Sequence, residues 1–189
     1  RDLRQAAPSR LRSIFGRYTE RLQQRAAGID DRPVIPDVDE KQISAEETFD
    51  TDIADPARLH AEIVRLADKA CTRLRAKGLA CGCVTVKIRR GDFTTYTRQR
   101  QVEPRTQETR VVARIAAELL DGWRRTQPQA ALRLLGVGVS DLGEEVQADL
   151  FAAPESTRNR QLDATVDAVR EKFGAVALRP ASTIVKPQE

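Results

Sequence analysis

Residues 84–102 read VTVKIRRGDFTTYTRQRQV, and this stretch decides the fold. Within 84–89, apolar side chains at every second position alternate with polar ones, which is the period of a strand with one buried and one solvated face. Gly91 and Asp92 then supply a turn, after which residues 93–102 return as a second strand. The stretch therefore predicts a β-hairpin.

A helix is predicted on each side of this hairpin. Asp55 is placed as an N-cap with Pro56 at the first helical position, and an apolar stripe then runs towards a stop at Gly78: Leu59, Ile63, Leu66, Ala70 and Leu74. Thr106 is predicted to cap the second helix, which carries a broad apolar face: Val111, Val112, Ile115, Ala116, Leu119 and Trp123.

Two further extended segments complete the order of elements. Residues 43–49 precede the first helix, and residues 132–139 follow the second. The resulting order is βαββαβ, which predicts an α+β fold with a four-stranded sheet and both helices on one face. The other face of the sheet is then open and carries the outward side chains of the strands.

Helical segments flank this domain. Residues 11–27 have apolar side chains at helical spacing before a stop at Gly28, with Gly16 as a point where the helix can break. A last helix, ended by Gly174, carries one apolar row: Leu162, Val166, Val169 and Phe173. The last three of these are interpreted as core or packing residues. The predicted divisions are a helical part (1–30), a linker (31–41), the βαββαβ domain (42–140) and a tail (141–189).

Composition points to a chain that works in a reducing compartment away from membranes. No segment approaches the ~18–20 consecutive apolar residues of a membrane span, and residues 1–4 lack the apolar region of a signal peptide. The 3 cysteines are expected to be reduced thiols in a cytosol. A start at Arg1 and the absence of methionine suggest a piece of a longer protein.

The net charge of +4 hides a segregated pattern. Residues 36–56 hold eight acids against Lys41 alone, whereas residues 73–133 hold fourteen basic residues against five acids. The base-rich segment is therefore expected to meet an anion.

The base-rich segment coincides with the predicted strands. Lys87 and Arg89 lie two apart on the solvated face of their strand, and the hairpin partner carries Arg98 and Arg100; Arg90 and Arg133 complete the cluster. Like charges on neighbouring strands destabilise a sheet, so the pattern favours a polyanion that lies across it and releases counterions. The alternative is a solvated strand face whose arginines only keep an exposed sheet in water.

The nature of the polyanion follows from the scarcity of aromatic residues. RNA-recognition sheets stack bases on aromatic side chains, and only Phe93 and Tyr96 are available here. We therefore expect contact with the backbone of duplex DNA, insensitive to sequence, rather than an RNA-binding module of the same topology.

No motif predicts catalysis or a metal site. Cys81 and Cys83, with Cys71 and His60, lack the spacing of a zinc site and are interpreted as core residues. Glu46 and Glu47 point to opposite faces of a strand, so they cannot readily share a magnesium ion. We therefore expect no catalytic residue, metal or cofactor in this chain.

Seven strings follow one another along the chain: FG (15–16), AGIDDRPV (27–34), EETF (46–49), TVKIR (85–89), DFTT (92–95), TR (97–98) and RLLGV (133–137). Together they resemble the thumb and little-finger regions of Y-family, translesion DNA polymerases of the DNA polymerase IV type. Three positions depart from the usual residues of that family: Thr19, Gln99 and Gln101.

The resemblance implies a role for each part. Residues 1–30 would end the thumb, and residues 42–140 would form the little finger, whose open sheet lies in the major groove of primer-template DNA. Phosphate contacts fall on Lys87, Arg89, Arg98 and Arg100, with hydroxyl partners at Thr94 and Thr97. The whole enzyme would transfer nucleotides with magnesium held by a palm domain outside this chain. The alternative is a catalytically inactive relative that acts as an adaptor, binding both DNA and the sliding clamp.

Residues 147–151, QADLF, resemble the pentapeptide by which bacterial polymerases dock on the β sliding clamp. Leu150 and Phe151 would enter an apolar pocket, while Gln147 and Asp149 complete the motif. The alternative is that Leu150 and Phe151 fold back onto the core of this chain. The implied partners are duplex DNA and the clamp, for a monomer in the bacterial cytoplasm.

Overall fold

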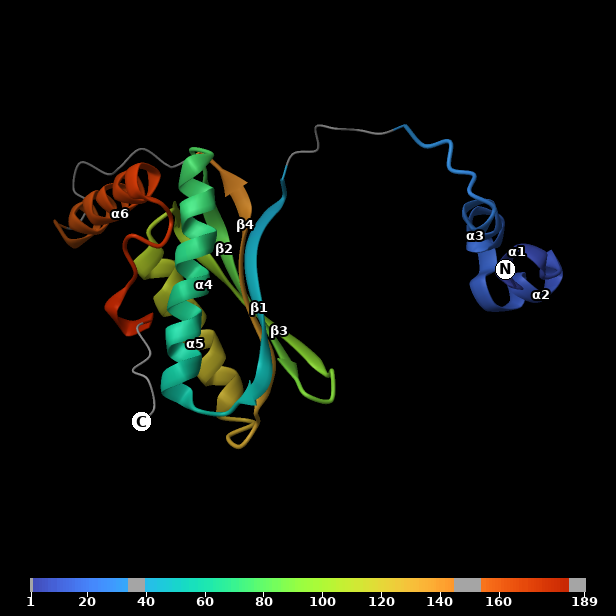
Figure 1. The fold of residues 1–189 in the computed structure, drawn as a ribbon, viewed down its shortest axis with the longest axis horizontal. Helices are drawn as coiled ribbons and strands as arrows, with labels where there is room; N and C mark the ends of the chain where they lie inside the picture. Colours follow the sequence, from blue (N-terminus) through green and yellow to red (C-terminus); the bar gives the residue numbers. More distant parts are fainter. Residues whose placement is uncertain (1, 34–39, 145–153, 184–189) are drawn as a thin grey trace. The chain divides into compact units, whose positions relative to one another are not determined.

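The structure, a computed structural model, describes residues 2–33, 40–144 and 154–183. The chain divides into two compact units, residues 1–39 and residues 40–189. Figure 1 labels their helices and strands, and each unit is described by itself.

The first unit is a short helical array. It contains α1 (Asp2–Gln5), α2 (Pro8–Phe15), a 3-10 turn η1 (Gly16–Tyr18) and α3 (Thr19–Ala26). Gly16 has φ 53° and ψ −132°, a conformation that residues with a Cβ rarely adopt. The chain therefore breaks at Gly16, and the predicted helix over 11–27 is divided there. The Gln23 side chain donates a hydrogen bond to the Ala6 carbonyl oxygen, which ties α3 to the turn after α1.

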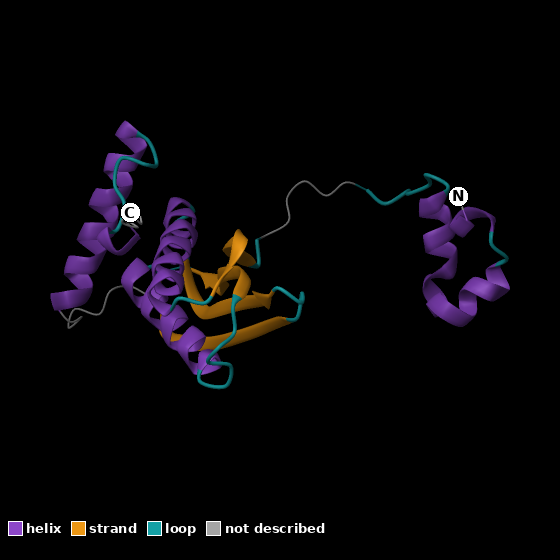
Figure 2. Cartoon of the chain, turned by 60° about the horizontal axis from the view of Figure 1, so that its bottom comes forward, coloured by secondary structure: helices purple, strands orange, loops and turns teal. Residues whose placement is uncertain are grey.

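The second unit is a four-stranded antiparallel sheet with helices on one face. Its strands are β1 (Gln42–Ile53), β2 (Ala80–Arg90), β3 (Thr95–Thr106) and β4 (Leu132–Gly143), in the order β1-β4-β2-β3. The helices α4 (Pro56–Ala76) and α5 (Thr109–Arg124) pack side by side on the same face, as Figure 2 shows. The predicted α+β fold is confirmed.

The hydrophobic core lies between this sheet and the two helices. From α4 and α5 it receives Leu59, Ile63, Leu66 and Trp123, each at most 2% exposed. The inward side chains of the strands meet them, among them Val84, Val86 and Ile88. Each fully buried aliphatic side chain stabilises the fold by roughly 1.5–3 kcal/mol, so this layer holds the hairpin in place.

The cysteines are buried, free thiols. Cys71 and Cys81 belong to the hydrophobic core, as predicted. Burial raises the pKa of Cys81 to about 11 and the pKa of Cys71 still further, so both thiols are protonated at neutral pH.

Helix α4 begins and ends where its sequence predicts. The Asp55 carboxylate accepts hydrogen bonds from the amides of Ala57 and Arg58, at 3.1 and 3.2 Å. Pro56 occupies the first turn, and Gly78 follows the helix with φ 65°. These are the usual start and stop residues of a helix.

The start of α5 differs from the prediction, which placed the cap at Thr106. The helix begins at Thr109, and the Thr106 hydroxyl accepts a hydrogen bond from the Glu108 amide instead. The Thr109 amide donates to a carboxylate oxygen of Asp163, 2.9 Å away on another helix. A cap supplied from a distant part of the chain leaves no local signal in the sequence.

That distant carboxylate belongs to α6 (Pro154–Phe173), which also differs from expectation. The prediction that Phe173 packs is wrong, because its side chain is 66% exposed, and Leu162 in the same row is 61% exposed. Val166 and Val169 are half-buried, but neither belongs to the core. Polar contacts hold α6 in place instead.

Two arginines make the principal contacts of α6. Arg75 of α4 donates to Asp167 at 2.6 Å and lies 3.3 Å from Asp163. Arg170 of α6 donates to both carboxylate oxygens of Asp68 on α4, at 3.0 and 2.8 Å. The helix is therefore docked by charge, and all five side chains are at most 26% exposed.

Within the ranges that the structure describes, no helix is both long and apolar enough to cross a membrane.

Candidate nucleic-acid interface

The open face of the sheet is a regular lattice of side chains from all four strands. Residues directly opposite one another in antiparallel strands point to the same face, so the register defines the rows of this lattice. One row runs through Glu46, Gly136, Lys87 and Thr97. The rows beside it are Ser44, Gly138, Thr85, Gln99 and Thr48, Leu134, Arg89, Thr95. Helices α4 and α5 pack on the opposite face.

At the centre of the open face, Gly136 has no side chain that projects from the sheet. A Cβ added there would lie 2.8 Å from Cγ of Glu46, closer than real side chains approach. The absence of a side chain therefore lets Glu46 lie across β4 and reach Lys87 on β2. The ammonium of Lys87 donates to both Glu46 oxygens, at 2.8 and 3.1 Å.

Arg133 is also held by the acid-rich strand β1. Its Nε lies 2.7 Å from an Asp52 carboxylate oxygen, and its guanidinium donates to the carbonyl oxygens of Phe49 and Asp50. These bonds give Arg133 a structural role, because they join β4 to the bulge in β1. The acidic and basic segments, which are separate in the sequence, therefore lie in one sheet. Acidic side chains of β1 neutralise part of the positive charge on β2 and β4.

Arg89 keeps its charge without an acidic partner. Its Nε donates to the Thr95 hydroxyl at 2.8 Å, and it has no ion pair within the described part of the chain. Among the predicted phosphate contacts on the open face, Arg89 is the cation that is uncompensated. Lys87 lies in the adjacent row.

Arg98 and Arg100 do not share this face. Their partners across the hairpin are Val86 and Val84, which point into the core. Arg100 accordingly reaches α5, where it donates to Glu118 at 2.5 Å. The interpretation that places all four hairpin cations on one face is therefore wrong. The reason is that β3 is an exposed edge strand, whose sequence lacks the apolar alternation that would fix its phase.

Tyr96 is likewise turned to the helices. Its ring packs on Trp123 of α5, with the ring centroids 5.4 Å apart. The three rows of side chains on the open face therefore contain no aromatic residue. Stacking of bases has no platform there.

The hairpin turn carries two of the residues predicted to contact DNA, Arg90 and Thr94. Thr94 is exposed, and its amide donates to Asp92 at 2.9 Å, a bond that lowers the pKa of Asp92. Arg90 lies 3.6 Å from the same carboxylate. Phe93, which the sequence analysis weighed for base stacking, has φ 64° and is 74% exposed.

The predicted clamp-binding residues Gln147, Asp149, Leu150 and Phe151 lie outside the described residues. Within the residues that are described, no group of three or more His, Cys, Asp or Glu side chains could hold a metal ion. Glu46 and Glu47 do point to opposite faces, since Glu47 pairs with Arg65 of α4 at 2.7 Å.

Residues 40–150, which include the whole sheet, match the model of the impB/mucB/samB family C-terminal domain. The chain belongs to this family. The match covers both helices that back the sheet as well as the open face.

Curated relatives of this chain are named DNA polymerase IV. That of Dehalococcoides mccartyi is 38% identical over 174 residues, which cover 92% of this chain and 44% of the relative. That of Streptomyces coelicolor is 39% identical over 158 residues, which cover 83% of this chain and 32% of the relative. The family member described here is related to Y-family DNA polymerase IV, as its sequence strings suggest, but spans less than half the length of these relatives.

The fold is shared with a solved Y-family polymerase. A chimera of the Y-family DNA polymerases Dbh and Dpo4 superposes on 76% of this chain and 40% of its own, with a TM-score of 0.51 at 16% identity. At that identity the likeness concerns the fold alone.

Proposed function

We propose that the domain of residues 40–144 is a little finger that grips the backbone of primer-template DNA with the open face of its sheet. The observation that carries the proposal is the open-face lattice, in which the uncompensated Arg89 lies among small polar side chains and glycine. Membership of a family whose relatives are named DNA polymerase IV supports the same assignment.

The chemistry of this face suits phosphates better than bases. Arg89 and Lys87 supply charge, and the Thr97 hydroxyl lies beside them as a hydrogen-bond donor. Contacts of this kind position a protein on a duplex without reading its sequence. Gly136 and Gly138 add no side chain at the centre of the face, where the side chains of Glu46 and Gln42 lie over them. Three predicted contacts fall outside this set. Arg100 pairs with Glu118 of α5, and Arg133 pairs with Asp52 of β1. Arg98 lies on the helix side of β3, opposite Val86.

Glu46 of β1 would weaken the binding of DNA phosphates to this face. In the free chain Glu46 occupies the Lys87 ammonium, so a phosphate must displace a carboxylate before it can bind there. The exchange weakens binding, and it favours a ligand that offers several phosphates at once. We infer that the little finger binds DNA reversibly and relies on a second attachment for residence.

That second attachment is proposed to be the QADLF segment at residues 147–151, docking on a β sliding clamp. A clamp that encircles DNA would raise the effective concentration of the little finger at the primer terminus. The nucleotidyl transfer implied by the name of the relatives needs magnesium carboxylates. The described residues do not fit that ion, so we assign the catalytic step to a part of the enzyme outside this chain.

Titration of the chain with a fluorescent primer-template duplex, and separately with single-stranded RNA, tests the proposal. Duplex binding that weakens with salt and is indifferent to sequence is expected. Preference for the RNA would instead favour an RNA-binding module and contradict the assignment.

Replacing Glu46 with glutamine is expected to tighten duplex binding about 1.4- to 5-fold, because an exposed ion pair contributes roughly 0.2–1 kcal/mol that phosphate no longer has to overcome. Fluorescence anisotropy at low salt measures the change. Glu47→Gln is the matched control, since Glu47 lies next in the chain but pairs with Arg65 on the helix face. Equal effects of the two substitutions would argue against the open face.

A further inference from the structure

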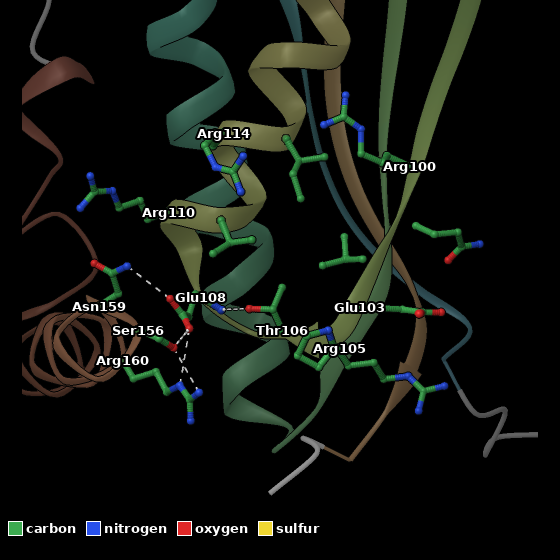
Figure 3. A pocket seen from close by; sticks show the side chains of 15 residues that line it. Arg100, Glu103, Arg105, Thr106, Glu108, Arg110, Arg114, Ser156, Asn159 and Arg160 are labelled. Atoms are coloured by element: carbon green, nitrogen blue, oxygen red, sulfur yellow. Dashed lines mark hydrogen bonds and ion pairs between the residues drawn. The ribbon is translucent and has the colours of Figure 1, made fainter. Parts of the chain in front are cut away.

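A groove of about 750 Å³ lies on the helix side of the sheet, away from the open face. Figure 3 shows it between β3 and the helices α5 and α6. Residues 100–106 of β3 form one wall, and Val111 and Ile115 of α5 lie opposite. Ser156 and Asn159 of α6 close one end.

The lining holds two glutamates and five arginines: Glu103, Glu108, Arg100, Arg105, Arg110, Arg114 and Arg160. Arg105 is paired with Asp141 at 2.9 Å and Arg160 lies 3.5 Å from Glu108, so the charge that matters here is that of Arg100 and Arg114. Arg100 and Arg114 share one carboxylate, that of Glu118, at 2.5 and 3.1 Å. The hydrogen bond from Arg100 is the main reason why the pKa of Glu118 is lowered. One carboxylate cannot neutralise two guanidinium groups, so this wall keeps an excess of positive charge.

The groove also borders a free strand edge. β3 ends the sheet order, and within the described ranges no strand pairs with its outer edge. Such an edge presents backbone donors and acceptors that can accept another extended chain, although Pro104 supplies only its carbonyl oxygen. Apolar side chains lie beside it, because Val102 and Val111 are half-buried and Ile115 is 5% exposed.

We propose that this groove binds an acidic peptide in extended conformation, which pairs with the outer edge of β3 as an added strand. Side chains of a strand alternate between two faces, so every second residue of such a peptide would point toward α5. Carboxylates at the ends of the groove meet the arginines, and a small apolar side chain between them contacts Val102 and Val111. The proposal is independent of the DNA-binding function, because the groove and the open face lie on opposite sides of the sheet.

A single-stranded nucleic acid would satisfy the charge but not the rest of the groove. Its bases would need aromatic side chains to stack on, and the groove's lining contains none. A peptide uses both the backbone edge and the apolar wall, so we argue for the peptide.

The first test uses the whole chain and a fluorescein-labelled eight-residue peptide in which Asp, Val and Asp stand at every second position and so share one face, with Ser at the other positions. Anisotropy is expected to show binding that falls at least 10-fold when every Asp is replaced by Asn. Arg100→Ala together with Arg114→Ala should weaken binding at least 10-fold, whereas Arg58→Ala on α4 should not. Arg100→Lys with Arg114→Lys, which keeps the charge, should retain most of the binding. Equal binding by all variants would overturn the proposal.

The second test addresses the strand edge. Methylating alternate backbone nitrogens of the same peptide, in either of the two possible registers, removes donors without changing charge. At least one register is expected to lose binding 10-fold or more, and no loss in either would rule out strand addition. Oligothymidylate of twelve nucleotides serves as competitor, and full displacement at a lower concentration than that of the peptide would assign the groove to nucleic acid. Duplex binding by the Arg100 and Arg114 double alanine variant should stay within 2-fold of the unmodified chain, which separates this proposal from the function of the open face.

Discussion

Replacing Arg75 with alanine is expected to lower the free energy of unfolding by about 3–5 kcal/mol, the usual cost of removing one partner from a buried ion pair. The Arg75 side chain is 12% exposed and joins three parts of the domain. It contacts Asp163 and Asp167 on α6, and it donates to the Gln107 carbonyl oxygen and the Thr109 hydroxyl at the start of α5.

Loss of Arg75 would leave the partly buried carboxylates of Asp163 and Asp167 without this cationic partner. Burial raises the pKa of Asp163 even with the Thr109 amide and Arg75 beside it, so without Arg75 that carboxylate becomes harder still to keep charged. Because α6 contributes no side chain to the core, we expect it to leave the domain before the sheet unfolds.

Urea unfolding followed by circular dichroism measures the change, and Arg73→Ala provides a matched control on the same helix. Arg73 is exposed, and it donates a hydrogen bond to the Ser44 carbonyl oxygen on the sheet, so its loss should cost under about 1 kcal/mol. If both variants lost the same stability, α6 would not be docked by charge.

Replacing Leu150 and Phe151 together with alanine is expected to weaken β-clamp binding by about 100-fold or more, because apolar anchors of an interface commonly contribute 2 kcal/mol or more each. Surface plasmon resonance with immobilised clamp measures the loss. The melting temperature and duplex affinity should stay unchanged, since the motif is proposed to act only as a tether.

Two outcomes separate the alternatives for this motif. A large fall in melting temperature would show that Leu150 and Phe151 belong to the core. Unchanged clamp binding in a stable variant would remove the docking role. Gln161→Ala, an exposed residue of α6, is the control that leaves the motif intact.

The parts of the fold with strong local signals could be predicted from sequence. Helix α4 carries its cap, its proline and its stop at neighbouring positions, and β2 shows the alternation of a half-buried strand. The buried residues of β2 fix its phase, so the faces assigned to Lys87 and Arg89 were correct.

Other features depend on contacts between distant residues. The phase of β3 could not be predicted because both of its faces are largely exposed, and this misplaced Arg98 and Arg100. The Asp163 cap of α5 and the pairing of Glu46 with Lys87 join residues far apart in sequence. Charge segregation along the chain therefore overstated the charge of the folded face.

The most direct test of the DNA-gripping face is the salt dependence of duplex affinity for the chain and for its Lys87→Ala, Arg89→Ala double variant. The slope of log K against log salt should become shallower by about 2 in the variant, uniformly across duplex sequences. Arg58→Ala with Arg73→Ala, two exposed positions on α4, should leave the slope unchanged. An unaltered slope in the open-face variant would contradict the account, because the duplex would then be held elsewhere.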